Sequence, residues 1–174
     1  IIKESLIDYI ENIPLTYIDL IDKDLGGDGK CDIVELYRKH NPVKYMNIYT
    51  KQEIKNKIKE KSYNSVIVDL YMLSIIYNIN IIVLQNRITA KGNNKGFYCI
   101  GTNIIESPNY ILLYTIEKKN STIYNLIQKE KKVYFKYNEL PSKFTSFINC
   151  NKDIKKIKII KTSEKKKIKI KKNN

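Results

Sequence analysis

The stretch that decides the fold is Val66–Arg87, VIVDLYMLSIIYNINIIVLQNR. Its first half repeats large apolar side chains at intervals of three and four, at Val66, Leu70, Leu73 and Tyr77. This spacing predicts a buried helix over residues 66–77. Asn78 and Asn80 then favour a turn, and residues 81–84 have the β-branched composition of a short strand.

A second apolar run, YILLYTI at residues 110–116, is the natural strand partner of 81–84. Both runs are apolar on every face, which is typical of strands covered on both sides. A buried helix that leads into a two-faced strand predicts an α/β (α+β) domain, with a small central sheet flanked by helices.

The rest of the chain supplies shorter elements. Helical spacing predicts helices over residues 1–13, 17–22, 32–40 and 51–61. Thr16 is expected to cap the second of these, and Thr50 with Glu53 forms a capping box for the fourth. RITAKGNNKG at 87–96 is predicted to be a hydrophilic loop. Strands are predicted over 97–101, 123–127 and 133–137, the last two as a pair, and a short helix over 140–148.

The chain is predicted to consist of one domain and a basic tail. At 174 residues it is long enough for one domain, predicted over 1–150, followed by a lysine-rich tail over 151–174. The tail holds eleven lysines against two acidic residues, so it supplies +9 of the net charge of +14. The excess of Ile, Lys, Asn and Tyr is typical of an AT-rich genome. Because the chain begins with Ile1 instead of Met, we expect it to be a piece of a longer protein.

The cysteines and the hydropathy of the chain indicate the expected cellular compartment. Three scattered cysteines, without a CxxC pair, do not form a disulfide framework, so a reducing intracellular setting is expected. No apolar run reaches the roughly 18 residues that a membrane span needs.

Three motifs follow the order found in a known family. Asp28, Gly29 and Cys31 form a DGxC turn that opens a helix, DLYMLSIIYNINIIVL forms a helix–strand pair, and YNLI stands at 124–127. Together they resemble OTU-type (ovarian tumour) cysteine proteases, and in particular the OTU-like domains within large proteins of giant, nucleocytoplasmic large DNA viruses. The resemblance covers 63–84 and 110–141. It implies that Asp28 and Cys31 lie at the nucleophile turn and Asn125 in the family's His-Tyr-Asn segment.

The chain departs from that family at the catalytic base. A thiol protease needs an imidazole to hold its cysteine as thiolate, and the corresponding position is Ile123. The only histidine, His40, would lie about 13 Å from Cys31 along one helix, whereas proton transfer needs about 3 Å. Asp28, Cys31 and Asn125 are therefore degenerate catalytic candidates. His40 is interpreted as a helix C-terminal residue that interacts with the helix dipole.

The same loop partly matches a calcium-binding loop. Its acidic residues stand at positions 1, 5, 9 and 12 of an EF-hand pattern, at Asp24, Asp28, Asp32 and Glu35. Gly26 at position 3 supplies no oxygen ligand. The alternative is a glycine-rich turn whose aspartates cap the next helix. We expect weak Ca²⁺ binding or none, and no cofactor.

The tail carries most of the basic residues. Those expected to contact nucleic acid or an acidic partner are Lys155, Lys156, Lys158, Lys161, Lys165, Lys166, Lys167 and Lys169. Clustered cations suffice to bind phosphates, but no aromatic residue stands among them for base stacking. Isoleucines that alternate with the lysines would also suit an added edge strand. A solvated terminus without a role is the alternative.

These observations predict a catalytically silent OTU-like domain that acts as a structural or protein-interaction module. The expected partners are proteins of a larger viral assembly or polypeptide, in the host-cell cytoplasm or the virion. An atypical deubiquitinase that uses Cys31 is the first alternative, and a basic nucleic-acid-associated domain is the second.

Overall fold

The computed structural model describes residues 2–89, 92–101, 107–118, 121–146 and 148. The chain forms two compact units, Ile1–Phe135 and Lys136–Asn174. In the second unit the described elements are the 3-10 helix η1 (Tyr137–Glu139) and a helical segment over 142–146. The predicted domain boundary at residue 150 lies next to residues outside this description, so it stays a prediction.

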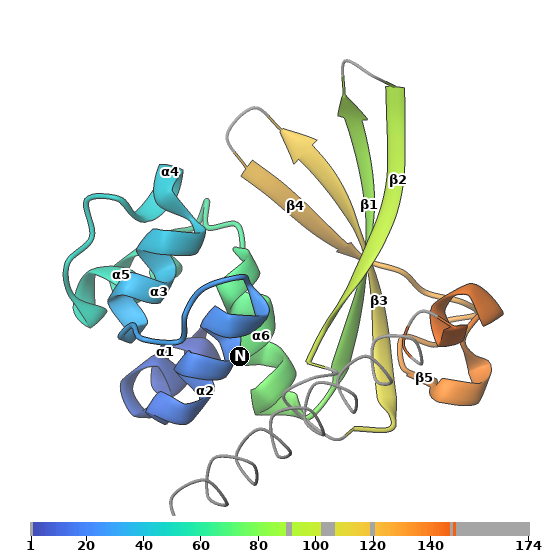
Figure 1. Cartoon of the computed structure of the whole chain (residues 1–174), viewed down its shortest axis with the longest axis horizontal. Helices are drawn as coiled ribbons and strands as arrows, with labels where there is room; N and C mark the ends of the chain where they lie inside the picture. The colour runs from blue at the N-terminus through green and yellow to red at the C-terminus, as the bar shows by residue number, and fades with distance from the viewer. Residues whose placement is uncertain (1, 90–91, 102–106, 119–120, 147, 149–174) are drawn as a thin grey trace, which may run out of the picture. The chain divides into compact units, whose positions relative to one another are not determined.

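Six helices are described in the first unit: α1 (Ile2–Asn12), α2 (Leu15–Asp24), α3 (Ile33–His40), α4 (Pro42–Tyr45), α5 (Lys51–Lys59) and α6 (Ile67–Tyr77) (Figure 1). Five of them lie where the apolar spacing predicts them. The predicted cap of α2 is wrong, because Pro14 occupies the N-cap and Thr16 lies inside the first turn. The α5 capping box of Thr50 and Glu53 is confirmed.

Helix α6 is the central helix expected from the sequence. It is apolar on nearly every side, and its buried residues include Val68, Leu70 and Met72. Asn78 ends it in a left-handed conformation (φ 48°), which asparagine tolerates better than a β-branched residue does. The chain then turns directly into the first strand.

The described strands are β1 (Asn80–Thr89), β2 (Gly92–Ile100), β3 (Asn109–Lys118), β4 (Ser121–Leu126) and β5 (Phe135–Lys136). Their order is β2-β1-β3-β4, and β5 pairs with β3. Strands β1 and β3 run parallel from Asn80 opposite Tyr110, whereas β1–β2 and β3–β4 are antiparallel. The predicted pairing of 81–84 with 110–114 is confirmed, and so is the mixed α/β class.

Two predictions about the sheet are wrong, one of a loop and one of a strand pairing. Residues 87–89 and 92–96, predicted to be loop, continue the β1–β2 ladder, with Arg87 opposite Asn94 and Thr89 opposite Gly92. A ladder is held by backbone hydrogen bonds, so polar side chains do not prevent it. The predicted strands 123–127 and 133–137 do not pair with each other, because β4 and β5 each pair with β3.

One hydrophobic core joins the helices to the sheet within the first unit. Its largest fully buried side chains include Leu36 and Tyr37 of α3, Ile54 and Ile58 of α5, and Ile81 of β1. Helix α6 contacts β1 and β2 of the sheet. Along the described part of the chain, no helix is long and apolar enough to cross a membrane.

Candidate functional site: an apolar groove between α6 and β4

A groove of about 600 Å³ lies between α6 and the β3–β4 part of the sheet, within the first unit. Its size falls within the range of roughly 300–1,000 Å³ that is usual for binding sites. One wall is formed by α6 and the other by β4, through Leu70, Leu73, Tyr77, Thr122, Tyr124 and Leu126. We refer to this cavity as the α6–β4 groove.

The lining of the groove is mainly apolar and partly open to solvent. Tyr77 and Leu126 are 42% and 43% exposed, and Tyr134 on the rim is 54% exposed. An apolar surface open to water is unfavourable unless something covers it. The groove is therefore a candidate binding surface.

The end of the groove next to the start of α6 is lined by Tyr63, Asn64 and Ser65. Two ammonium groups contact the ring of Tyr63, with Lys44 Nζ 3.9 Å and Lys3 Nζ 5.7 Å from its centroid. Lys44 Nζ also donates to the carbonyl of Asn64, and Lys3 Nζ to that of Glu60. Partial burial lowers the pKa of Lys44. Among the described residues, neither lysine has a carboxylate within ion-pair distance.

Asp69 fixes the position of Tyr63. Its carboxylate is fully buried and accepts hydrogen bonds from the hydroxyls of Tyr37 (2.7 Å) and Tyr63 (2.6 Å) and from the Val66 amide (2.7 Å). Burial raises the pKa of Asp69, and these three donors oppose the rise. The Tyr45 hydroxyl lies 2.8 Å from that of Tyr63 and completes the network. The cationic end of the groove is thus attached to a rigid, buried support.

Sequence reasoning missed this network. The available signal was a single carboxylate inside an otherwise apolar run, Asp69 in VIVDLYMLS, since a buried carboxylate needs donors. The sequence gives no comparable indication that the partners come from α3 and from the segment before α6.

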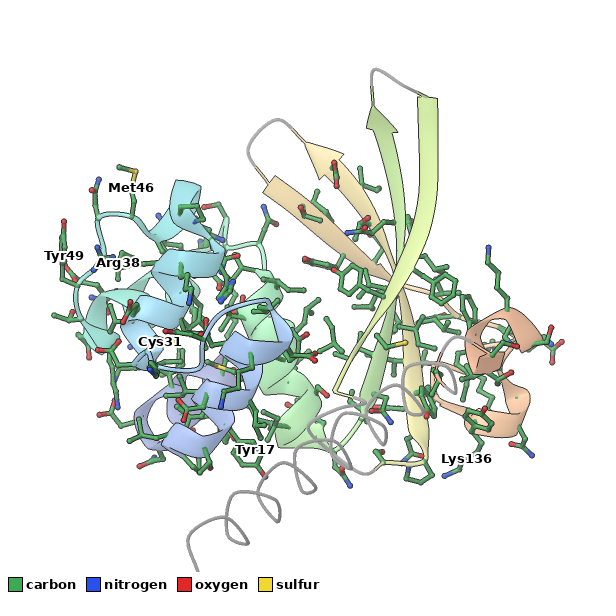
Figure 2. The ribbon with its side chains drawn as sticks, viewed as in Figure 1. Tyr17, Cys31, Arg38, Met46, Tyr49 and Lys136 are labelled. Carbon is green, nitrogen blue, oxygen red and sulfur yellow. The ribbon has the colours of Figure 1, made fainter. Side chains whose placement is uncertain are left out.

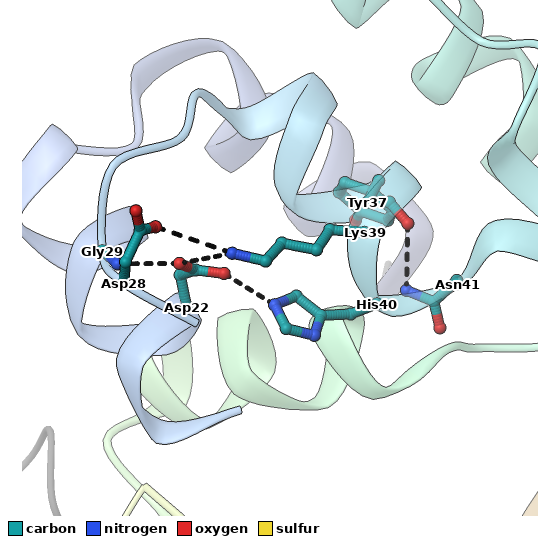
Figure 3. A network of polar contacts seen from close by, with 7 residues as sticks. All are labelled: Asp22, Asp28, Gly29, Tyr37, Lys39, His40 and Asn41. Carbon is teal, nitrogen blue, oxygen red and sulfur yellow. Dashed lines mark hydrogen bonds and ion pairs between the residues drawn. The ribbon is translucent and has the colours of Figure 1, made fainter. Parts of the chain in front are cut away.

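A second polar network surrounds Asp22, which is fully buried at the end of α2 (Figure 3). Its carboxylate accepts from His40 Nε2 (2.7 Å), Lys39 Nζ (3.2 Å) and the Gly29 amide (2.8 Å). Burial raises the pKa of Asp22, but the hydrogen bonds from His40, Gly29 and Lys39 outweigh it and bring the pKa to about 2. A Cβ on Gly27 would collide with this carboxylate, so the loop needs glycine there.

His40 therefore has a contact that the sequence did not predict. It stands at the end of α3, as expected, but its ring is bound to Asp22 and joins α3 to α2. No sequence pattern links positions 22 and 40.

Cys31 lies among the helices (Figure 2) and does not line the groove. Its side chain is buried, at 8% exposure. Burial, followed by the nearby carboxylates of Asp22 and Glu35, raises the pKa of the thiol to about 11. A thiol in this state is almost fully protonated at neutral pH and is a poor nucleophile.

Of the other degenerate catalytic candidates, Asp28 lies in the same loop as Cys31, whereas Asn125 lies on the sheet. Asn125 stands on β4 opposite Tyr114 of β3, and its side-chain nitrogen is buried without a hydrogen-bond partner in the described structure. Ile123, where the family's histidine is expected, lines the groove. Asp28 is exposed and lies 3.7 Å from Lys39 Nζ.

The acidic residues of the calcium-like loop have separate partners. Asp24 accepts from the Tyr71 hydroxyl (2.6 Å), and Asp32 caps α3 by accepting from the Glu35 amide (2.8 Å). No cluster of three or more potential metal ligands occurs within the described ranges. The capping interpretation of Asp32 is confirmed.

The predicted tail residues, Lys155 to Lys169, lie outside the described residues, so their predicted role is untested. Comparison with protein-family models, with curated proteins and with solved structures gave no match to this chain.

Proposed function

We propose that this chain is an OTU-like domain without protease activity, and that it works as a protein-interaction or structural module within a larger viral assembly or polypeptide. The observation that carries the proposal is the composition of the α6–β4 groove. Among the described residues, its lining contains neither a cysteine, a histidine nor a carboxylate, and the position of the family's base is an isoleucine, Ile123 of β4. Such a surface can bind a partner, but its described lining offers neither the thiol nor the imidazole that a thiol protease needs.

The polar networks support the same conclusion. Nucleophilic catalysis by Cys31 would need an accessible thiolate next to a free imidazole. The Cys31 thiol is buried and its pKa is raised to about 11. The only imidazole, that of His40, is bound to Asp22.

A ubiquitin-based electrophilic probe tests the proposal. We expect no labelling of Cys31 in the folded protein, and no cleavage of ubiquitin chains. Ile123→His should not restore activity, because the thiol stays buried. Unfolding the protein in urea before labelling is the control that shows the probe reaches Cys31 once burial is removed. Turnover by the unmodified protein that Cys31→Ala abolishes would favour the deubiquitinase alternative instead.

The proposal also includes the cellular location of the protein. The resemblance to viral OTU-like domains supports a place in the host-cell cytoplasm or the virion. The nucleic-acid alternative depends on the lysine-rich tail.

A further inference from the structure

We propose that the α6–β4 groove binds an extended, acidic segment of a partner protein, which pairs with the outer edge of β4, fills the groove with apolar side chains and directs its acidic residues to Lys3 and Lys44. This inference rests on the proposed function and names the kind of segment that the interaction module accepts.

The backbone of β4 provides the first argument. In the described sheet β4 pairs with β3 alone, from Leu126 opposite Leu113 to Ser121 opposite Lys118. Alternate residues of an edge strand direct their N–H and C=O groups away from the sheet, where an extended peptide can pair with them. Strand addition of this kind is a common mode of peptide recognition.

The side chains of the groove provide the second argument. Thr122, Tyr124 and Leu126 alternate along β4, as residues on one face of a strand do, and all three line the groove. A strand added beside β4 would direct every second side chain towards the same face. Leu73 and Tyr77 of α6, on the opposite wall, are then available to cover those side chains.

The positive charge near the groove favours an acidic segment over a second copy of this chain as its occupant. Lys3 and Lys44 do not line the groove, but both contact the ring of Tyr63 at its end, and neither has a carboxylate within ion-pair distance among the described residues. An acidic segment would complete two ion pairs there. A second copy of this chain has a net charge of +14, so self-association would bring like charges together.

The probe is a fluorescein-labelled nine-residue peptide of alternating valine and threonine with two aspartates at one end. It is made with the aspartates at either end, because strand addition can be parallel or antiparallel. Two comparison peptides replace the aspartates with lysines or methylate the backbone nitrogens. Fluorescence anisotropy measures binding to the full chain, and mass spectrometry of the same samples shows whether the peptide remains intact.

We expect the aspartate peptide to bind, and the lysine and N-methylated peptides to bind at least about fivefold more weakly. Leu126→Ser removes a groove side chain that is 43% exposed, and the matched control Leu20→Ser removes one on α2 that is 41% exposed. Lys3→Glu reverses a charge at the Tyr63 end, and Lys30→Glu makes the same change in the loop before α3. The two groove variants should weaken binding about two- to fivefold or more, and the two controls should leave it unchanged. Circular dichroism confirms that each variant is folded.

Each outcome separates the two proposals. Equal affinity for the aspartate and lysine peptides, or equal effects of Leu126→Ser and Leu20→Ser, would overturn this inference and leave the proposed function intact. Cleavage of the peptide would overturn the proposed function. If no peptide binds, the inference is wrong, and direct binding of laurate would then show that the groove accepts a fatty acid.

Discussion

At the scale of single residues, two buried carboxylates organise the helical part of the first unit. Asp22 joins α2 to α3 through His40, and Asp69 joins α3 to the segment before α6 through Tyr37 and Tyr63. A buried carboxylate is tolerated only when donors compensate its lost hydration. Both residues therefore constrain several elements at once, although neither contacts an expected partner.

Asp22 should make stability depend on acid pH. Its pKa is lowered from 3.8 to about 2 in the folded protein, so its contribution is fully present above pH 3.8 and is lost as the pH falls towards 2. Asp22→Asn should lower the free energy of unfolding by about 1–3 kcal/mol near neutral pH, because the donors lose a charged acceptor. The difference between the two proteins should shrink below about pH 4. Urea unfolding at several pH values measures this, and a difference that stays constant down to the lowest pH would exclude Asp22 as its source.

At the scale of elements, one of the two helix caps predicted from local motifs is confirmed and the other is wrong. The Thr50–Glu53 pair caps α5, with Thr50 Oγ1 accepting from the Glu53 amide and Glu53 Oε2 accepting from the Thr50 amide. Thr16 has the residue type of a cap, but α2 begins one residue before it. The difference arises because Pro14 already sets the extended conformation that precedes the helix.

Two alanine substitutions test this difference. Thr50→Ala should lower the free energy of unfolding by about 0.5–2 kcal/mol, because an amide of the first turn of α5 loses its acceptor. Thr16→Ala, its matched control, should change that free energy by less than about 0.5 kcal/mol. Urea unfolding of both variants at one pH supplies the comparison. An equal loss in both would mean that Thr16 stabilises the start of α2 as much as Thr50 stabilises α5.

At the scale of the whole molecule, the basic tail and the first unit are separable in the sequence. The hydrophobic core is formed almost wholly within the first unit, up to Leu113, whereas +9 of the charge lies beyond residue 150. Folding of the first unit should therefore not depend on the tail, and binding to acidic surfaces should.

Deletion of residues 152–174 tests this separation. The shortened chain should remain folded by circular dichroism and should still bind the aspartate peptide, but it should lose any association that the tail provides. If the tail binds duplex DNA through about six lysines, the logarithm of affinity should fall with the logarithm of salt concentration with a slope of roughly −5. A protein partner held by the tail's isoleucines should retain a salt-resistant part of its affinity. Unchanged association after deletion would mean that the tail has no binding role.

The sequence by itself determined the features that depend on neighbours along the chain. The apolar runs at 66–84 and 110–116 predicted α6, β1 and the pairing of β1 with β3, because burial on all sides requires a place in the core. The capping box at Thr50 follows equally from local hydrogen bonding.

Only the tertiary structure decided which distant residues meet. Asp22 contacts His40 across 18 positions and Tyr37 contacts Asp69 across 32, and no periodicity records such pairs. The antiparallel pairing of residues 87–89 with 92–94 was missed because a ladder depends on backbone pairing and not on apolar side chains. The groove likewise depends on how far α6 extends over the sheet, which is set by the packing of all the helices and by no segment alone.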